Sequence, residues 1–585
     1  MIPNDFRTID GVLHYRAEAQ ADDPAFTFLN DGETPGETLS YRLLDARSGA
    51  LAVMLRDWRI QRALLVYPPG LEFIVAFFAC LFAGITPVPA GLAHITRIGR
   101  SLTRLRAVAR DAAADAVLST TRVIDRALAD PDFVNRSPEL ADLRWLATDT
   151  NDESVGSHRH HAAPAPDTPA FIQYTSGSTS APKGVVVSHR NLIENLKHIN
   201  EVEENGNDSI SVSWLPHSHD MGLIEAILLP TFAGYPAYLM SPASFLRRPA
   251  RWLEAITRFR ATNSGGPNFA YDLCVQKIST SEQDNLDLNS WRVAYNGSEP
   301  IRKTTLVRFA ERFGHSGFRW NTFYPVYGLA ESTLLVTSGQ AEDAPAFREL
   351  DADALARNIV AAPGPRTTKT VAVAASGKLS MRARVVIANP ETFAEVGPDE
   401  IGEIWVASPA VAKGYWQRPA DTESTFRAYL AGSHDGPFLR TGDLGFISNG
   451  HLFVTGRIKD IINIRGYKHY PQDIEHTIAQ TYPAVAANRC AAFAVDRDGT
   501  EELVVVLEGA PQRFADFDWD DRTIASIRDA VNESHGVQIR SVVLTPYGAI
   551  PKTTSGKLQR HLCRASFIEG NLNMVRVWTH AVEQA

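Results

Sequence analysis

The sequence predicts an α/β fold divided into at least two domains. Apolar segments typical of strands alternate with segments of helical apolar spacing along most of the chain, and this alternation is characteristic of α/β proteins. With 585 residues, the chain is too long for one hydrophobic core. Its composition, 44% hydrophobic and 21% charged, is typical of a soluble globular protein.

Charge and hydropathy argue against two classes of partner. The net charge of −9 offers no electrostatic attraction for nucleic acid. The apolar run at residues 73–90 is interrupted by Gly84, Pro87 and Pro89, too early for the span of about 20 residues that a membrane requires. We therefore expect a buried helix followed by a short buried strand, and no integral membrane segment.

The cysteines and the first residues indicate a cytoplasmic protein. The start of the chain contains acidic residues and lacks the apolar centre of a signal peptide. The cysteines lie far apart in the sequence and form no metal-ligand or redox motif, which fits a reducing compartment. We expect buried or incidental roles for all of them: Cys80, Cys274, Cys490 and Cys563.

The first candidate site is a loop rich in glycine, serine and threonine at residues 174–184. Its sequence, YTSGSTSAPKG, presents backbone N–H groups and hydroxyls that suit phosphate oxygens. A Walker A loop carries glycine before its lysine and a hydroxyl residue after it, and it opens a helix. Here Pro182 and Gly184 flank Lys183, and strands are expected on both sides of the loop. These features argue against a Walker ATPase, and the strands argue against a plain surface linker.

Two later segments carry groups that suit a nucleotide base and a metal ion. Residues 295–300, YNGSEP, form a turn-rich edge after an expected strand, although a simple tight turn would have the same composition. Residues 321–332, NTFYPVYGLAES, place Tyr327 and Glu331 around a glycine. An aromatic ring suits the face of a base, and a carboxylate suits Mg²⁺.

Two further segments carry groups that suit a sugar and a reacting anion. Within residues 438–446, FLRTGDLGF, Asp443 can accept hydrogen bonds from both hydroxyls of a ribose, and Arg457 supplies the opposite charge. Residues 551–560, PKTTSGKLQR, place Lys557 directly after a glycine. Each of these segments by itself would be an ordinary loop.

In this order and at these spacings, the segments resemble the adenylate-forming enzyme superfamily: acyl-CoA synthetases, luciferases, peptide-synthetase adenylation domains and fatty acyl-AMP ligases. The resemblance extends from residue 39 to the lysine motif at residues 551–560. It implies a two-step reaction. A carboxylate attacks the α-phosphate of ATP to form acyl-AMP and pyrophosphate, and a thiol then accepts the acyl group.

The resemblance also implies roles for individual residues. Lys557 would bridge two anions, the carboxylate and the α-phosphate, whose repulsion is about 4 kcal/mol per charge pair at about 4 Å in an effective dielectric constant of about 20. Glu331 would hold Mg²⁺. The implied residues of the phosphate loop are Thr175, Ser176, Gly177, Ser178, Thr179 and Lys183. The implied adenine- and ribose-binding residues are Asn296, Gly297, Ser298, Glu299, Tyr327, Gly328, Asp443 and Arg457.

The implied architecture is a large N-terminal domain of several subdomains, residues 1–457, and a small α+β domain, residues 458–585, joined by a hinge. In this superfamily the small domain rotates between the two half-reactions, and here it would carry Lys557. The hinge position corresponds to Lys459, which by composition alone would belong to a surface linker.

Residues 213–224, SWLPHSHDMGLI, narrow the choice within the superfamily. His217, His219 and Asp220 could bind a metal, but a cluster without a distant partner is a weak metal motif. The segment resembles the WLPxxHDMGL signature of fatty acyl-AMP ligases, which implies that His219 lies near the acyl carboxylate. Residues 241–274 extend the likeness, and the implied acyl-binding residues are Asp220, Met221, Ser264, Gly265, Gly266 and Asn268.

Residues 333–375 form a connection longer than a compact CoA ligase usually has at this point. This resembles the insertion that marks fatty acyl-AMP ligases. Such an insertion would dock on the large domain and restrict the rotated arrangement that CoA requires. The alternative is a passive loop insertion, which a protein surface tolerates at low cost.

We therefore predict a fatty acyl-AMP ligase that uses ATP and Mg²⁺ to activate a medium- or long-chain fatty acid. Burial at about 0.8 kcal/mol per methylene favours long chains without defining one length. Because no carrier module follows Ala585, we expect the acceptor to be the phosphopantetheine arm of a separate acyl carrier protein. The rival interpretations are a long-chain fatty acyl-CoA synthetase and a non-enzymatic sensor of nucleotide and lipid.

Overall fold

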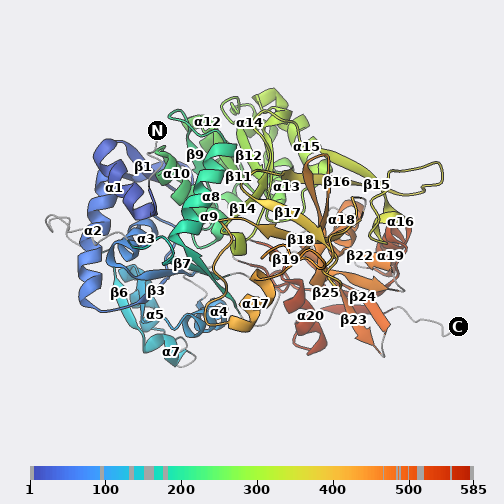
Figure 1. Cartoon of the computed structure of the whole chain (residues 1–585). Helices are drawn as coiled ribbons and strands as arrows, with labels where there is room; N and C mark the ends of the chain where they lie inside the picture. The colour runs from blue at the N-terminus through green and yellow to red at the C-terminus, as the bar shows by residue number, and fades with distance from the viewer. Residues whose placement is uncertain are drawn as a thin grey trace.

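The computed structural model describes residues 6–91, 98–130, 133, 137–149, 164–174, 182–398, 400–464, 467–482, 485, 489–497, 500–509, 520–553 and 556–579. The N-terminal part is built around a large mixed sheet and a smaller parallel sheet. From residue 458 onward the chain forms a smaller part with its own sheet, which we call the C-terminal lobe (Figure 1).

The large mixed sheet positions the candidate site. Its neighbouring strands are, in order, β17 (Arg384–Ala388), β18 (Gly402–Ala407), β19 (Leu439–Ser448), β20 (His451–Arg457), β16 (Thr370–Lys378), β14 (Leu335–Ser338), β13 (Phe323–Gly328), β12 (Val293–Asn296), β11 (Asn263–Gly266), β9 (Ser211–Ser213), β10 (Ala237–Leu239), β1 (Pro24–Asn30) and β2 (Thr34–Ser40), with β15 (Phe347–Asp351) paired to β16. Strands β11, β12 and β13 are parallel. Their carboxyl ends therefore meet at one edge, where open α/β sheets bind ligands.

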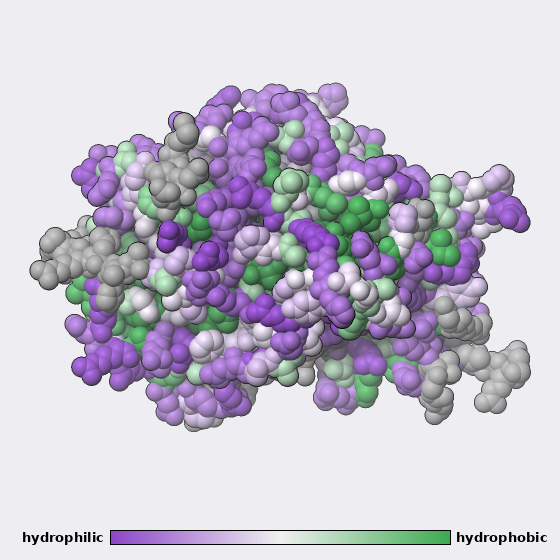
Figure 2. All heavy atoms as spheres, viewed as in Figure 1, coloured by the Kyte–Doolittle hydropathy of each residue, from purple (hydrophilic) through white to green (hydrophobic). Residues whose placement is uncertain are grey.

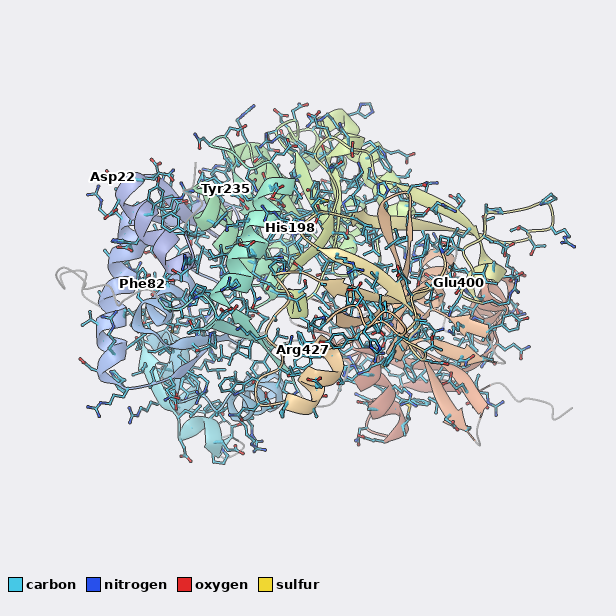
Figure 3. All side chains as sticks on the ribbon, viewed as in Figure 1. Asp22, Phe82, His198, Tyr235, Glu400 and Arg427 are labelled. Carbon is cyan, nitrogen blue, oxygen red and sulfur yellow. The ribbon has the colours of Figure 1, made fainter. Side chains whose placement is uncertain are left out.

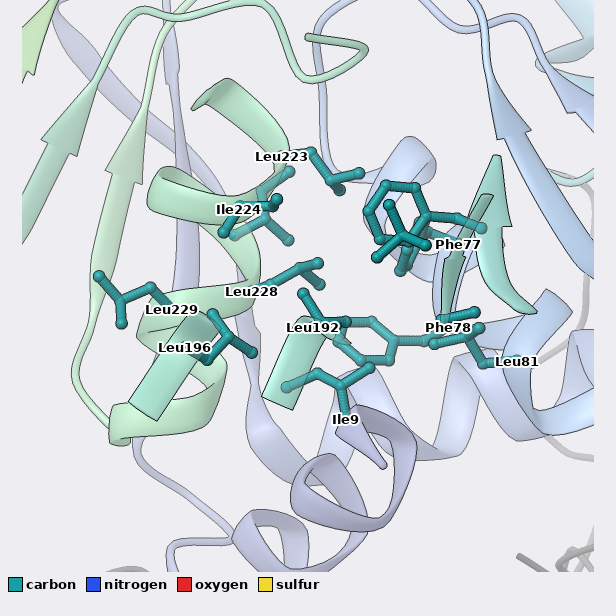
Figure 4. Packing of buried hydrophobic residues seen from close by; sticks show 14 of the residues in the cluster. Ile9, Phe77, Phe78, Leu81, Leu192, Leu196, Leu223, Ile224, Leu228 and Leu229 are labelled. Carbon is teal, nitrogen blue, oxygen red and sulfur yellow. The ribbon is translucent and has the colours of Figure 1, made fainter. Parts of the chain in front are cut away.

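The smaller parallel sheet has the strand order β4 (Thr86–Pro89), β3 (Arg62–Leu65), β5 (Ala116–Ser119) and β6 (Arg144–Ala147). The apolar run at residues 73–90 forms helix α3 (Glu72–Ala83) and strand β4, and both are mostly buried, as predicted. Phe77 and Phe78 of α3 pack into one cluster with Leu192 of α8 (His189–Val202) and with Leu228 (Figure 4).

The described helices and one face of the surface can be compared with the predicted absence of a membrane span. None of the helices found there is both long enough and apolar enough to cross a membrane. The face in Figure 2 is largely hydrophilic, with apolar side chains in patches between polar ones. All four cysteines are buried and unpaired, as expected.

The predicted strands around the phosphate loop are confirmed. They are β7 (Pro169–Tyr174) and β8 (Gly184–Ser188), which pair antiparallel. The loop residues between 175 and 181 lie outside the described residues.

The remaining helices of the N-terminal part cover the sheets (Figure 1). They are α1 (Ile9–Ala19), α2 (Tyr41–Asp57), α4 (Ile98–Asp111), α5 (Thr121–Leu128), α7 (Pro138–Ala141), α9 (Asp220–Leu223), the π-helical turn η1 (Ile224–Leu228), α10 (Leu229–Ala233), α11 (Pro242–Arg247), α12 (Ala250–Phe259), α13 (Asn268–Lys277), α14 (Thr280–Gln283), α15 (Lys303–Phe313), η2 (Gly314–Ser316), η3 (Trp320–Thr322), η4 (Ala330–Ser332), α16 (Ala352–Leu355) and α17 (Pro419–Phe426).

The C-terminal lobe is an α+β unit with hydrophobic cores of its own. Its elements are η5 (Ile458–Asp460), β21 (Ile462–Ile464), β22 (Tyr467–His469), α18 (Pro471–Thr481), β23 (Cys490–Arg497), β24 (Thr500–Glu508), α19 (Asp521–His535), β25 (Ile539–Thr545), α20 (Arg560–Ile568) and β26 (Arg576–Thr579). Apolar residues of α18 and α19 form one cluster with the sheet, and Cys563 of α20 belongs to another. The boundary at residues 457 and 458 stays a prediction, as does the hinge at Lys459.

Part of the segment at residues 333–375 packs on the large sheet. Leu350 of β15 and Leu355 of α16 are buried in a cluster with Phe446 and Phe453 of β19 and β20. The same segment reaches the C-terminal lobe, because the backbone N–H of Lys468 in β22 donates to the carbonyl of Ala356 at 3.3 Å. Its effect on rotation of the lobe stays a prediction.

A pair of buried carboxyl groups lies between the end of α8 and η1. Glu203 and Glu225 are 4% and 8% exposed. The side-chain amides of Asn205 and Asn263 each donate to Oε2 of Glu203 at 3.0 Å. Burial raises the pKa of both carboxyls, and repulsion from Glu203 raises that of Glu225 further. A proton on Glu225 would relieve this repulsion, so we expect the two groups to share one in the folded protein.

We predict that Glu225→Gln removes a pH dependence of stability. Because the pKa is raised in the folded state, the folded protein keeps a proton that the unfolded chain releases near pH 4.5. The stabilisation that this proton contributes is fully present below about pH 4.5, and it is lost as the pH rises through the folded-state pKa of Glu225. A difference of one pH unit between the folded-state and unfolded-state pKa corresponds to about 1.4 kcal/mol. Melting temperatures measured between pH 5 and 8 should fall with pH in the parent and fall less in the variant.

The matched control is Glu311→Gln, a change at an exposed position of α15. It should leave the slope of melting temperature against pH as in the parent. An equal slope for Glu225→Gln and the parent would contradict the shared proton.

Candidate active site

A cleft of about 370 Å³ lies between the carboxyl ends of β12 and β13 and the C-terminal lobe. It brings together many of the predicted site residues from both parts of the chain. Those that line it are Asn268, Ser298, Glu299, Tyr327, Gly328, Asp443, Arg457 and Lys557.

Asp443 is the centre of a hydrogen-bonded group in this cleft. Strands β19 and β20 pair so that Asp443 lies directly opposite Arg457. Arg457 Nε donates to Oδ1 of Asp443 at 2.9 Å, and the Tyr327 hydroxyl donates to Oδ2 at 2.8 Å. The Asp443 side chain is only 7% exposed, and its charge raises the pKa of Arg457. Each carboxylate oxygen keeps a second lone pair, so the group can still accept a ribose hydroxyl.

Lys557 enters the cleft from the C-terminal lobe. Two hydrogen bonds join Thr553 and Lys557: the N–H of Lys557 donates to the Thr553 hydroxyl, and the N–H of Thr553 donates to the Lys557 carbonyl. Gly556 adopts a left-handed φ of +85°. Burial lowers the pKa of Lys557, and Arg457 lowers it further, while Asp220, Glu299 and Asp443 raise it. The carboxylates of the N-terminal part therefore offset some of the effect of burial on this ammonium.

His219 and Asp220 lie at the start of α9 and do not line the cleft, although the charge of Asp220 acts on Lys557. His219 is the N-cap of α9, and its Nδ1 lies 2.6 Å from Oδ1 of Asp220. Burial alone would raise the pKa of Asp220, but His219 and Lys557 lower it to about 2. The motif glycine that follows has no room for a side chain, because a Cβ on Gly222 would lie 2.0 Å from the carbonyl oxygen of Pro216.

The predicted acyl-binding residues other than Asp220 are buried, and only one of the set lines the cleft. Met221 is 5% exposed, and Ser264 is fully buried, with its hydroxyl donating to Val212 and accepting from the Trp252 indole. A Cβ on Gly265 would lie 2.1 Å from the Tyr295 carbonyl, and one on Gly266 would lie 2.6 Å from the Trp214 ring. Asn268 does line the cleft. The acyl-binding roles stay predictions.

The edge at residues 296–299 is tightly built. Asn296 is fully buried, and a Cβ on Gly297 would lie 2.6 Å from the Val326 side chain. Ser298 has a φ of +70°, a strained conformation for a residue with a side chain. Lys459 is exposed in η5.

The phosphate side of the site is described from Lys183 onward. Lys183 Nζ lies 2.9 Å from Oδ1 of Asp421 and 4.8 Å from the centre of the Tyr415 ring. Glu331 in η4 accepts a hydrogen bond from the Tyr415 hydroxyl at 2.8 Å, and burial raises its pKa. The predicted residues Thr175, Ser176, Gly177, Ser178 and Thr179 lie outside the described residues.

The motifs did not indicate Tyr415, Asp421 or the contact between Arg302 and Asp473. Arg302 Nη1 lies 2.7 Å from Oδ1 of Asp473 in α18 and so joins the C-terminal lobe to the large sheet. The partners are 171 residues apart in the sequence. No local pattern marks such pairs, because only the fold brings them together.

A cleft at the carboxyl ends of parallel strands, entered by a lysine from a second lobe, is the arrangement expected of the adenylate-forming class. Residues 13–416 match the family described as AMP-binding enzyme, and residues 459–577 match the Disco-interacting protein 2-like AMP domain. The chain belongs to the AMP-binding enzyme family.

Similar proteins cover almost the whole chain. JamA of Moorena producens strain JHB, named as a medium-chain fatty acid–acyl-carrier-protein ligase, is 42% identical over 97% of this chain and 96% of its own. FadD21 of Mycobacterium tuberculosis strain H37Rv, named only as a candidate fatty-acid–CoA ligase, is 36% identical over 94% of this chain and 96% of its own. The crystal structure of a fatty acid AMP ligase from Legionella pneumophila has 36% identity and a TM-score of 0.75, with 98% of each chain covered. The family and the fold class predicted from the sequence are confirmed.

We predict that Asp220→Asn lowers the pKa of Lys557. Asp220 is the first of the carboxylates that raise this pKa against burial, so its neutralisation leaves burial and Arg457 less opposed. Trace labelling with an amine-reactive reagent at a series of pH values, followed by peptide mass spectrometry, should show Lys557 reacting from a lower pH. Lys459, which is exposed, is the internal reference and should label as in the parent. An unchanged labelling curve for Lys557 would contradict this electrostatic coupling.

Proposed function

We propose that this protein is a fatty acyl-AMP ligase. It activates a medium- or long-chain fatty acid with ATP and delivers the acyl group to the phosphopantetheine thiol of a separate acyl carrier protein. The observation that carries the proposal is the cleft in which Asp443, Arg457 and Tyr327 of the N-terminal part meet Lys557 of the C-terminal lobe. The printed names of JamA and of the Legionella structure support the substrate and the acceptor.

The first half-reaction joins two anions. A carboxylate oxygen of the fatty acid bonds to the α-phosphorus of ATP, the bond to the bridging oxygen breaks, and pyrophosphate leaves. Lys557 lies between the anions and offsets a repulsion of about 4 kcal/mol per charge pair at about 4 Å. Asp443 with Arg457 holds the ribose, and Tyr327 with the edge at residues 296–299 holds the adenine.

The second half-reaction releases AMP. The thiol sulfur of the carrier arm attacks the acyl carbonyl, AMP leaves with the carboxyl-derived oxygen, and the thiol proton passes to solvent or a nearby base. His219, oriented by Asp220 at 2.6 Å, lies near the acyl carboxylate. The acyl chain runs along Met221 and the segment at residues 264–268, whose two glycines allow close packing of Tyr295 and Trp214 behind it.

Glu331 suits Mg²⁺. A carboxylate oxygen is a preferred ligand of this ion, and the Tyr415 hydroxyl binds Oε1 of Glu331, which leaves Oε2 as the donor to a metal. Bound Mg²⁺ would neutralise charge on the phosphates of ATP. Glu331 supplies the ligand, and Lys183 with the loop at residues 175–179 holds the β- and γ-phosphates. The buried free cysteines agree with a cytoplasmic setting.

Residues 333–375 favour the carrier protein over CoA. They pack on the large sheet through Leu350 and Leu355 and also bond to β22 of the C-terminal lobe. Such a double contact opposes rotation of the lobe, and this rotation is the arrangement in which a CoA ligase transfers its acyl group. A CoA ligase remains the alternative because FadD21 carries that name.

We expect Lys557→Ala to separate the two half-reactions. Loss of one transition-state cation typically costs a factor of about 10²–10³, so pyrophosphate release that depends on fatty acid should fall by that factor. Transfer from supplied acyl-AMP to a carrier protein should stay within about twofold, because it needs no bridge between anions. Lys277→Ala, at an exposed lysine in the last turn of α13, is the control. Equal loss in both half-reactions would contradict the role given to Lys557.

The acceptor is tested by a fatty-acid ladder with ATP and either CoA or a phosphopantetheinylated carrier protein, followed by mass spectrometry. We expect acylated carrier protein, with acyl-CoA formed at least about tenfold more slowly. Partial deletion within residues 333–375 should raise the rate with CoA. Abundant acyl-CoA from the intact protein would instead identify a CoA synthetase, and absence of pyrophosphate release with every acid would exclude an enzyme of this type.

A further inference from the structure

The segment before α17 crosses the base of the phosphate loop as an added strand. The N–H groups of Val186 and Trp416 donate to the carbonyls of Gly414 and Gly184, at 2.9 Å and 2.7 Å. Tyr415 forms a bridge with Val185 of β8 between these bonds. The backbone of Tyr415 is therefore fixed to the strand that leaves the loop. Helix α17 follows, ending just before Arg427, which is labelled in Figure 3.

The Tyr415 side chain contacts both charged groups of the phosphate side. Its hydroxyl donates to Oε1 of Glu331 at 2.8 Å, and its ring lies 4.8 Å from the Lys183 ammonium. The edge of Phe426 packs against the ring, with centroids 5.1 Å apart. An aromatic ring attracts a cation, and a hydroxyl orients a carboxylate. The Tyr415 side chain therefore contacts Lys183 with its ring and Glu331 with its hydroxyl.

Asp421 forms an ion pair with Lys183. Asp421 Oδ1 lies 2.9 Å from Lys183 Nζ. The Lys183 side chain is 22% exposed and the Asp421 side chain is 40% exposed. Phosphate oxygens would compete with this carboxylate for the ammonium. The contact of Lys183 with the Tyr415 ring is separate from its ion pair with Asp421.

We propose that Tyr415 is a positioning residue, which keeps the phosphate lysine Lys183 and the metal-binding carboxylate Glu331 apart and correctly oriented, and that Asp421 is the counter-ion that ATP displaces. The inference rests on the proposed roles of Lys183 and Glu331. Without the ring, Lys183 would lose its aromatic contact, and its ammonium could turn toward the Glu331 carboxylate. Without the hydroxyl, the Glu331 carboxyl could rotate about its terminal bond, which has broad torsional freedom.

The experiment measures binding rather than turnover. The probes are Mn²⁺, followed by electron paramagnetic resonance, and α,β-methylene-ATP, followed by calorimetry with and without Mn²⁺. Tyr415→Phe keeps the ring and removes the hydroxyl, so Mn²⁺ binding should weaken about tenfold, the value typical for loss of a hydrogen bond to a charged group. Binding of the analogue without metal should stay within about twofold. Tyr415→Leu removes the ring as well and should weaken both.

Asp421→Asn should strengthen binding of the analogue, whereas Tyr415→Leu should weaken it. Removal of the competing carboxylate should tighten metal-free binding of α,β-methylene-ATP by about threefold to tenfold. Tyr429→Phe, at an exposed tyrosine just beyond α17, is the matched control and should change neither affinity. Circular dichroism melting of every variant shows whether it is folded at the assay temperature.

Glu331→Gln separates a failure of this inference from a failure of the proposed function. If Glu331→Gln leaves Mn²⁺ binding unchanged, Glu331 is not the metal ligand and the proposal for Tyr415 falls with that assignment. If Glu331→Gln weakens Mn²⁺ binding and Tyr415→Phe does not, the positioning role is overturned while the metal assignment stands. In the Glu331→Gln background, Tyr415→Phe should have no further effect, and an additive loss would also overturn the proposal.

Discussion

The proposed chemistry depends on one electrostatic arrangement: a buried lysine of the C-terminal lobe lies within the influence of carboxylates of the N-terminal part. The charges of Asp220, Glu299 and Asp443 raise the pKa of Lys557, while burial and Arg457 lower it. Burial has the largest effect and the pKa is lowered, so the carboxylates offset only part of the cost of burying the ammonium. Other contacts join the lobe to the N-terminal part. They include the ion pair between Arg302 and Asp473, at 2.7 Å, and the hydrogen bond from Gln472 to the Thr455 carbonyl, at 3.0 Å.

The parallel strands explain why the motifs fall where they do. The ends of β12 and β13 place residues 296–299 and 327–328 at one edge of the sheet, and the register of β19 on β20 sets Asp443 opposite Arg457. Close approach of backbones limits the choice of side chain there. A Cβ on Gly328, for example, would lie 1.9 Å from the carbonyl oxygen of Leu334. The glycines of this motif follow from backbone packing as well as from ligand binding.

Local chemistry made much of the fold predictable. Strands β7 and β8, the buried α3 with β4, and the cleft residues Asp443 and Lys557 could be predicted because each is marked by its own short pattern. The family could be predicted because several such patterns occur in order.

The rest depends on partners that no local pattern connects. Glu331 and Tyr415 are 84 residues apart, and Lys183 and Asp421 are 238 apart. The inward hydroxyl of Ser264, bound by Trp252, was not predictable either, because a short strand buried on both faces shows no alternation to say which way a side chain points.

The cations of the proposed site lie close to carboxylates of the same chain. Lys183 is paired with Asp421, Arg457 with Asp443, and the charge of Asp220 acts on Lys557. Charges withdrawn from water without partners would be costly, and each partner offsets part of that cost. In the proposed site the pairs differ in what a ligand would do to them. A phosphate bound to Lys183 would compete with Asp421, whereas a ribose hydroxyl could bind Asp443 while Arg457 keeps its hydrogen bond to that carboxylate. Lys183 and Lys557 therefore suit the anionic groups of ATP and a fatty acid, and the pair of Asp443 with Arg457 suits the neutral sugar.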